Sequence, residues 1–369
     1  MIQRSYLLVP FSLLSCLWLL PASPSAEPGQ ADGEKQPAPR LATLHGNYYP
    51  LKTALADLDQ QTTNLVADQM GDPDPVFNLK PGLEGVTFWQ ALDAIAEKAG
   101  GRVDLHPREG GIALTKRPAG WKPPLVSHSG LFRITLNALT SKLDLESDAR
   151  ACTASVEVAW EPHLLPLLLE TRPRSLKVQD DAGKAVPVGA ATSSLAPVDG
   201  RTSLSFDVAL PSVERGVKKL SLVEGELYAV APTKMLTFSF DALTAAPGDA
   251  RLQQTQEEVE CRVARVVEED DRWSVAIELE YPEGNVHLDS YQSWVVNNEI
   301  YLEGKDGDRL PSSSYLLEGS TPRHATLTYH FTDKERMKRG LGVWKLVYRT
   351  PALVVKVPIQ FSFRDVPLP

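Results

Sequence analysis

The chain has 369 residues, of which 43% are hydrophobic and 23% are charged, a balance that is typical of globular proteins with a buried core. This length is sufficient for two or three domains. The formal net charge is -9, and no cluster of Lys and Arg is interleaved with aromatic residues. Because nucleic-acid binders carry such a basic patch, the sequence argues against a nucleic-acid partner.

The first 26 residues have the pattern of a signal peptide. Arg4 supplies a basic start, residues 6–20 are almost entirely apolar, and small residues follow. We therefore expect export to a periplasm or to the cell surface, with a disordered Pro/Gly/Glu linker over residues 27–40. No later stretch is apolar enough to span a membrane, so no transmembrane segment is predicted in the mature chain. Lipidation of Cys16 is the alternative, and the apolar residues directly after this cysteine argue against it.

Two segments, over residues 51–58 and 88–95, have the periodicity of amphipathic helices. In each, apolar residues recur at i, i+4 and i+7, which places them on one helix face. Thr87 with Gln90 forms a capping box before the second helix, and Gly100 supplies its end. The apolar positions are Leu51, Leu55 and Leu58 in the first helix and Phe88, Leu92 and Ile95 in the second.

Short strands are predicted around these helices, over residues 64–67, 76–79, 103–105 and 112–115. Strand-like residues also precede the first helix. The order is then strand, helix, strand, strand, helix, strand, strand, which is an α+β arrangement in which two helices cover a small mixed sheet. The predicted domain extends over residues 41–118.

The motif Pro50-Leu51-x-x-Ala54-Leu55-x-x-Leu58, followed by residues 86–95, resembles the secretin and TonB short N-terminal (STN-like) domain of bacterial envelope proteins. The resemblance covers residues 41–116, and it implies an exported module that contacts other proteins. The rest of the chain lacks the aromatic-flanked, membrane-length strands of a pore or receptor barrel. Pore formation and siderophore uptake are therefore not implied.

Beyond the hinge at residues 121–124 the hydrophobic period changes from near four to two, which is typical of strands. Two mainly antiparallel β-sandwich domains of immunoglobulin-like size are predicted, over residues 125–243 and 255–369, separated by the breaker-rich residues 244–250. In the first domain, residues 220–230 and 235–240 are predicted to form a hairpin. In the second, residues 259–267 turn at the acidic residues 268–271 and return over residues 273–281.

Pro358 lies in an alternating stretch that is predicted to be the last strand. Because proline has no N–H to donate, this strand is expected at a sheet edge, or this residue at a bulge. We hypothesise that a partner adds a strand at this edge.

Cys152 and Cys261 remain in the chain after the predicted signal peptide. A disulfide is possible in an oxidising compartment, but each cysteine begins a strand of a different predicted domain. Two buried free thiols are the favoured alternative.

No catalytic, cofactor or metal residue is predicted. The usual sequence signatures of hydrolases, NTPases and dehydrogenases are missing, and His324 and His330 lie too far apart on one strand to share a metal. The acidic turns at residues 268–271 and 306–308 lack the ligand series of a calcium loop and are predicted to be solvated hairpin tips. The basic residues 334–339 are interpreted as a solvated loop or turn of helix.

Three aromatic residues, Trp160, Tyr291 and Trp294, are candidates for lining a carbohydrate groove. The favoured alternative is a core tryptophan at 160 and loop aromatics that pack on their own sheet. The sequence as a whole predicts an exported, non-enzymatic envelope protein that acts as a protein-protein interaction or structural module, with another envelope protein as its partner. A carbohydrate-binding module or a carbohydrate-active enzyme is the alternative, since two facing carboxylates leave no local signature.

Overall fold

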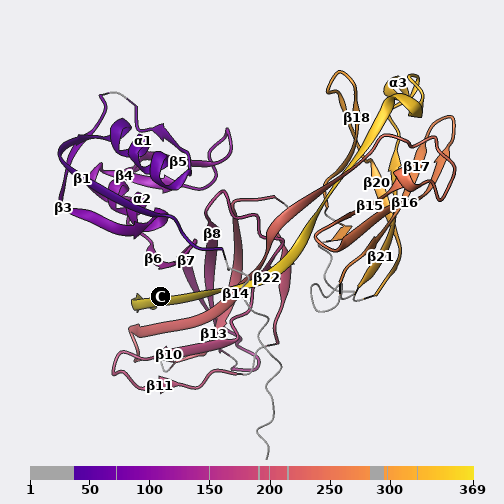
Figure 1. Cartoon of the computed structure of the whole chain (residues 1–369). Coiled ribbons are helices and arrows are strands. Elements are labelled where there is room, and N and C mark those ends of the chain that lie inside the picture. Colours follow the sequence, from indigo (N-terminus) through magenta and orange to yellow (C-terminus); the bar gives the residue numbers. More distant parts are fainter. Residues whose placement is uncertain are drawn as a thin grey trace, which may run out of the picture. The chain divides into compact units, whose positions relative to one another are not determined.

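The computed structural model describes residues 37–369, except residues 72, 149, 190, 191, 199, 214, 215, 283–294, 297 and 322. The described chain is mostly β, with several antiparallel sheets and few helices (Figure 1). This confirms the prediction of a β-rich fold. The predicted signal peptide and most of the predicted linker lie outside the described residues. Within the described ranges, no helix is both long enough and apolar enough to cross a membrane.

Residues 41–116 contain seven elements in the predicted order of strands and helices (Figure 1). The strands β1 and β3 pair antiparallel, while β2, β5 and β4 form a mixed sheet in which β2 and β5 are parallel. The elements are β1 (Leu41–Pro50), α1 (Leu51–Thr62), β2 (Val66–Gln69), β3 (Val76–Thr87), α2 (Phe88–Lys98), β4 (Gly101–Asp104) and β5 (Ile112–Lys116).

Both helices bury the predicted apolar face. Leu51 and Leu58 in α1 and Phe88, Leu92 and Ile95 in α2 are all 0% exposed. The N–H of Thr87 donates to Oε1 of Gln90 at 3.0 Å, and the capping box predicted for α2 is present. The helices therefore form where their local signals place them, and their buried faces build one hydrophobic cluster with the strands around them.

A four-stranded antiparallel sheet follows, in the order β13-β8-β7-β6. Phe132 and Ile134 of β7 are 0% exposed, but burial does not alternate there as the period of two predicts, because residues 132–136 are all buried. The strands are β6 (Leu125–Ser129), β7 (Phe132–Leu143), β8 (Arg150–Trp160) and β13 (Ser203–Leu210).

The largest sheet has eight strands and is built on two long ones, β14 (Lys219–Phe240) and β22 (Trp344–Pro367). These two pair antiparallel from Lys219 opposite Pro367 to Phe240 opposite Leu346. The other strands are β9 (Leu168–Glu170), β10 (Ser175–Gln179), β11 (Ala185–Val186), β12 (Leu195–Pro197), β18 (Ile300–Gly304) and β19 (Arg309–Pro311).

The hairpin predicted over residues 220–230 and 235–240 is wrong, because both segments belong to the single strand β14. The residues between them include Pro232, which is typical of turns. In the structure the chain stays extended there, and the irregularity is absorbed by register shifts between Pro232 and Met235.

The third antiparallel sheet has five strands in the order β15-β16-β17-β21-β20. The pairing of β16 with β17 across residues 269–272 confirms the predicted hairpin. The strands are β15 (Gln253–Gln256), β16 (Val259–Glu268), β17 (Trp273–Glu280), β20 (Ser314–Ser320) and β21 (His324–Phe331), and the short helices are η1 (Ala250–Leu252), α3 (Lys334–Met337) and η3 (Leu341–Val343).

Two hydrophobic clusters share the pair β14 and β22. The N-terminal half of β14 and the C-terminal half of β22 pack against the four-stranded sheet, with Ile359 and Phe363 in the same cluster as Trp160. The opposite halves pack against the five-stranded sheet, with Phe240 and Tyr348 in that cluster. Residues 255–369, predicted as one domain, thus contribute to both clusters.

Both cysteines are buried and free, Cys152 in the first of these clusters and Cys261 in the second. The structure therefore has the two buried thiols of the favoured alternative and no bond between them.

Gly225 of β14 lies opposite Phe361 of β22, and a Cβ at position 225 would lie 2.3 Å from Cζ of that buried ring. We predict that Gly225→Ala lowers the free energy of unfolding by about 1–3 kcal/mol, the usual cost of overpacking a core. Urea denaturation measures this, with Gly319→Ala as the matched control, because Gly319 also lies in a strand and has open space around it. Equal unfolding midpoints for the two variants would contradict the prediction.

Candidate functional site

A cavity of about 670 Å³ lies between α2, β4 and the hinge residues on one side and strands β6, β7 and β8 on the other. We call it the charged groove, because four acidic residues, four basic residues and two histidines line it. Its charged and histidine residues are Asp93, Glu97, Arg102, Asp104, His106, Arg117, Lys122, His128, Arg133 and Glu157.

Asp93 of α2 is the centre of the first polar cluster in the groove. Its carboxylate accepts hydrogen bonds from Nε and Nη2 of Arg133 in β7, at 2.9 to 3.1 Å, and lies 2.7 Å from Nε2 of His128 in β6. Arg133 also donates to Thr135 at 2.7 Å. Such a two-nitrogen fork on a carboxylate fixes both partners in position.

Burial alone would raise the pKa of Asp93, but the hydrogen bond with His128 and the charge of Arg133 outweigh it and lower the pKa. Asp93 is therefore ionised over the physiological range. Since Arg133 is only 7% exposed, its charge depends on Asp93 for compensation.

Glu157 of β8 is the centre of the second polar cluster. Its Oε1 lies 2.7 Å from Nε2 of His106, which follows β4, and accepts a hydrogen bond from the hydroxyl of Ser203 at 2.9 Å. Glu157 is 9% exposed, whereas the side chain of His106 is 71% exposed. The second cluster thus joins a buried carboxylate to a histidine at the rim of the groove.

The hinge provides an aromatic and cationic rim. The guanidinium of Arg117 lies 4.9 Å from the ring centroid of Trp121, and its Nε donates to the carbonyl of Gly101 at 2.7 Å. Within the described part of the chain, neither Arg117 nor Lys122 has an ion pair, and Nε of Arg102 is buried without a hydrogen-bond partner. Arg117 and Lys122 are therefore the cations of the groove that a ligand carboxylate could pair with, whereas Nη2 of Arg102 lies 3.7 Å from the carboxylate of Asp104.

Glu161 lies next to this region, directly after β8, and is 0% exposed. Its Oε2 accepts a hydrogen bond from Nδ2 of Asn64, which lies between α1 and β2, at 2.7 Å and is 3.5 Å from Nδ1 of His163. Its Oε1 is buried without a hydrogen-bond partner among the described residues. Burial raises the pKa of Glu161 to about 7, which the hydrogen bond from Asn64 and the charge of Arg40 only partly offset.

The sequence-based site residues are not brought together. Trp160 is 2% exposed in the hydrophobic core, so its indole offers no face to a ligand and has the core position that we favoured. Tyr291 and Trp294 lie outside the described residues. Pro358 is exposed on β22, on a different part of the chain from the groove-lining residues.

Pro358 lies in β22, which was predicted to be an edge strand but which the sheet order places between β14 and β18. Since β18 pairs only with Trp344–Tyr348, Pro358 has β14 as a strand partner on one side alone, in regular register. The amides of Gln360 and Ser362 point away from β14 and donate to the hydroxyls of Ser129 and Ser127 in β6, at 3.0 and 3.1 Å. Because alternate amides of a strand point the same way, the nitrogen of Pro358 faces that same edge, where no ladder bond is lost. Because the amides of Gln360 and Ser362 are already hydrogen-bonded to β6, few backbone groups of this part of β22 remain to pair with an added strand.

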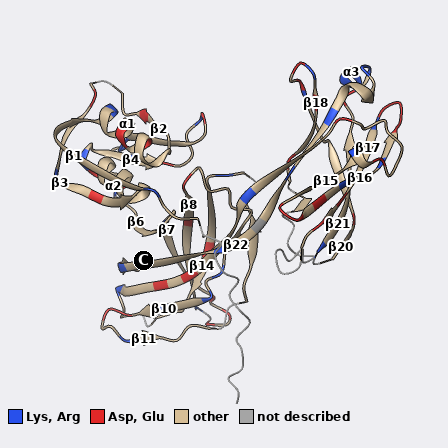
Figure 2. Cartoon of the chain, viewed as in Figure 1, with Lys and Arg blue, Asp and Glu red and all other residues tan. Residues whose placement is uncertain are grey.

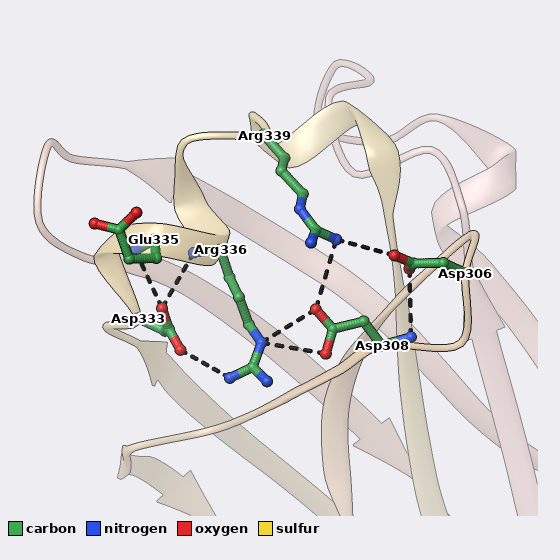
Figure 3. Close-up of polar contacts among 6 residues, drawn as sticks. All are labelled: Asp306, Asp308, Asp333, Glu335, Arg336 and Arg339. Carbon is green, nitrogen blue, oxygen red and sulfur yellow. Dashed lines mark hydrogen bonds and ion pairs between the residues drawn. The ribbon is translucent and has the colours of Figure 1, made fainter.

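The second acidic turn is part of an ion-pair cluster (Figure 3). Arg336 contacts Asp308 at 3.2 Å and Asp333 at 2.8 Å, and Arg339 lies 3.4 Å from Asp306. The basic residues 334–339, predicted as a loop or turn of helix, contain α3 and neutralise this turn. The cluster holds the tip of the β18–β19 hairpin to α3.

Lys and Arg residues are interspersed with Asp and Glu along the described chain (Figure 2). Among the described residues, no group of three or more His, Cys, Asp or Glu side chains is placed to hold a metal ion. Comparison of the chain with protein-family models, with curated proteins and with solved structures finds no match.

Sequence reasoning missed the charged groove because its partners are far apart in the chain. Asp93 and His128 are separated by 35 positions, and His106 and Glu157 by 51. The sequence gives no clear signal, since Arg133, Thr135 and Glu157 alternate with apolar residues as exposed strand positions do, although all three are buried in the structure. Polar residues at such positions require partners, and the only remaining question is which ones.

Proposed function

We propose that this protein is an exported, non-enzymatic binding protein that receives a segment of another envelope protein in the charged groove. The single observation that carries the proposal is the lining of the groove, which combines fixed polar clusters with an open cationic and aromatic rim. The STN-like resemblance of residues 41–116 supports a role in protein contact, and the signal-peptide pattern supports export.

The polar clusters favour binding over catalysis. Asp93 is engaged by Arg133 and His128, and Glu157 by His106 and Ser203, so both carboxylates already have two partners. A general acid and base pair needs carboxyl groups that exchange protons with a substrate, whereas these groups are held as acceptors within the protein. Their effect is to fix the walls of the groove in advance of binding, which lowers the entropy cost of association.

The rim indicates the chemistry of the partner. Arg117 and Lys122 are exposed cations without carboxylate partners in the described part of the chain, and Trp121 lies between them in the sequence. Arg and Trp are the residues that most often dominate binding energy at protein interfaces. We therefore propose an extended peptide segment with an acidic side chain, whose carboxylate pairs with Arg117 or Lys122.

Affinity capture from an envelope extract of the producing cells tests this function. We predict that the wild-type chain retains a specific protein and that Trp121→Ala and Arg117→Ala each weaken its retention at least about tenfold, since a hot-spot truncation costs roughly 2 kcal/mol or more. The matched controls are Tyr48→Ala and Arg272→Ala, which remove an exposed aromatic residue and an exposed arginine elsewhere. Capture that all four variants retain equally would contradict the role of the groove.

A further variant separates the groove from another surface. Strand β20 is the edge of the five-stranded sheet, and its residues Tyr315, Leu316 and Leu317 are 49%, 56% and 39% exposed. Such apolar edges bind other strands. Loss of capture in Leu316→Lys, with the groove variants unaffected, would assign binding to β20 and overturn the proposed site.

Carbohydrate binding is a second candidate, because Trp121 and the polar side chains of Thr135 and Asn137 line one cavity. Aromatic faces with neighbouring hydrogen-bond donors and acceptors are the groups that sites of this kind use. A glycan array decides between the two. A specific glycan signal that Trp121→Ala abolishes and Tyr48→Ala leaves unchanged would favour carbohydrate over peptide.

A further inference from the structure

Strand β20 lies at one end of the five-stranded sheet and carries three consecutive exposed apolar residues, Tyr315, Leu316 and Leu317. Among the described residues, β21 is the one strand that pairs with it, so the other edge of β20 has no strand partner there. Exposed apolar residues on a free strand edge are typical of sites where another strand pairs.

The register of β20 with β21 distributes these three residues over both faces of the sheet. Tyr315 and Leu317 lie opposite residues of β21 that are at most 1% exposed in the core, and the ring of Tyr315 lies 6.4 Å from that of Tyr329. Because residues directly opposite each other share a face, Tyr315 and Leu317 continue the core face of the sheet. Leu316 lies opposite Thr328, on the other face.

The opposite edge of the same sheet, strand β15, is protected. Its four residues are all polar, and two of their side chains bond to the backbone of β14. Nε2 of Gln254 donates to the carbonyl of Ser239 at 2.5 Å, and Nε2 of Gln256 donates to the carbonyl of Thr237 at 2.8 Å. Polar residues and a covering segment are two of the means by which proteins block strand edges. Strand β20 has three apolar residues in their place.

Glu318, the one charged residue of β20, is engaged by its own sheet. Its Oε1 accepts hydrogen bonds from the hydroxyl of Thr328 at 2.6 Å and from Nη2 of Arg265 at 3.1 Å. A register shift between Leu317 and Gly319 places a bulge at Glu318, so the regular edge is short. An incoming strand therefore meets a short apolar edge whose single charge is already compensated.

This edge is complementary to a second copy of itself. Two β20 strands that run antiparallel about a two-fold axis at Leu316 place this residue opposite its own copy, Tyr315 opposite Leu317, and Ser314 opposite Glu318. Each apolar side chain then meets an apolar side chain on the same face, and each Glu318 meets a hydroxyl. The two Glu318 residues are four positions apart along the strands, about 14 Å, which exceeds the Debye length of about 8 Å.

We propose that β20 is a self-association edge, through which two copies of this chain pair antiparallel and join their five-stranded sheets into one continuous sheet. This surface is distinct from the charged groove, and the inference does not depend on the proposed function. A standard protein interface has about 20–30 residues a side, whereas β20 has seven. The dimer is therefore expected to be weak and to depend on protein concentration.

Sedimentation velocity of the full chain, over concentrations from about 10 μM to about 1 mM, tests the dimer. We expect the average mass to rise from that of one chain toward that of two. Leu316→Lys places two like charges opposite each other on the two-fold axis and should raise the dissociation constant at least about tenfold. The matched control is Leu165→Lys, which should associate as the wild type does, because Leu165 is 57% exposed, Leu316 is 56% exposed, and Leu165 lies outside β20.

A mixture of two variants identifies the second copy as the occupant of the edge. Leu316→Lys and Leu316→Glu should each remain monomeric alone, and an equimolar mixture should dimerise, because opposite charges then face each other. Restored association also shows that β20 is folded in both variants.

Three results would overturn the proposal: a wild type that remains monomeric at the highest concentration, association that Leu316→Lys leaves unchanged, or a mixture that remains monomeric. A monomeric wild type whose capture of an envelope protein is lost in Leu316→Lys would assign the edge to a strand of that protein instead.

Discussion

Replacing Asp93 by leucine is expected to lower the free energy of unfolding by about 3–5 kcal/mol, the cost of leaving one partner of a buried ion pair uncompensated. The physical reason is the position of Arg133, which is 7% exposed and has its charge balanced by this carboxylate. Urea denaturation at pH 7 measures the loss. Asp93→Leu leaves this buried guanidinium without the one carboxylate that pairs with it among the described residues.

Two further variants test whether the stability loss in Asp93→Leu comes from the broken ion pair or would follow from any loss of a carboxylate. Glu224→Gln removes a carboxylate from an exposed pair with Lys177, and exposed pairs contribute about 0–1 kcal/mol. The double variant Asp93→Leu with Arg133→Met removes both charges and should lose less stability than Asp93→Leu alone. If the stability lost by the double variant equals the sum of the losses in Asp93→Leu and in Arg133→Met alone, the two side chains are not coupled.

Stability is expected to fall by about 3 kcal/mol as the pH rises through the range in which Glu161 ionises, because a pKa difference of one unit corresponds to about 1.4 kcal/mol. The pKa of Glu161 is raised from 4.5 to about 7 in the folded chain by burial. Below pH 4.5 both states hold the proton, between the two values only the folded state does, and above pH 7 neither does. Folding is therefore favoured in acid relative to neutral pH.

Chemical denaturation at pH 5 and pH 8 measures this dependence. Glu161→Gln keeps the size and the acceptor oxygen of the side chain but cannot ionise, so its stability should change less between the two pH values than that of the wild type. Glu224→Gln, at an exposed position, should keep the wild-type dependence. A Glu161→Gln variant with the full wild-type dependence would show that another group is responsible.

Local patterns predicted the elements whose partners are near in the chain. The helices around Leu55 and Leu92 are specified by apolar spacing and by the capping box at Thr87, and the hairpin of β16 and β17 by the acidic turn between two alternating segments. Strand β14 was divided at Pro232 because a proline between two apolar segments is locally indistinguishable from a turn. Only its partner β22, more than a hundred residues later, keeps it extended.

The charged groove could not be predicted from local sequence patterns either, because its residues come from distant parts of the chain. Asp93, Arg133 and Glu157 look like ordinary charged residues on a helix and two strands, and their function as partners depends on how the α+β region, residues 41–116, meets the four-stranded sheet. The hydrogen bonds of Trp89 with Leu131 and of Asn64 with Glu161 connect the α+β region to the sheet, and neither bond has a sequence signature. In contrast, Trp160 was correctly favoured as a core residue because an alternating strand places it on the buried face.

The pairing of β14 with β22 makes two hydrophobic clusters depend on one pair of strands. The cluster that contains Trp160 takes Ile359 and Phe363 from one half of β22, and the cluster around Tyr348 takes its residues from the other half. A truncation after residue 352 would therefore remove the β22 residues of the first cluster and keep those of the second.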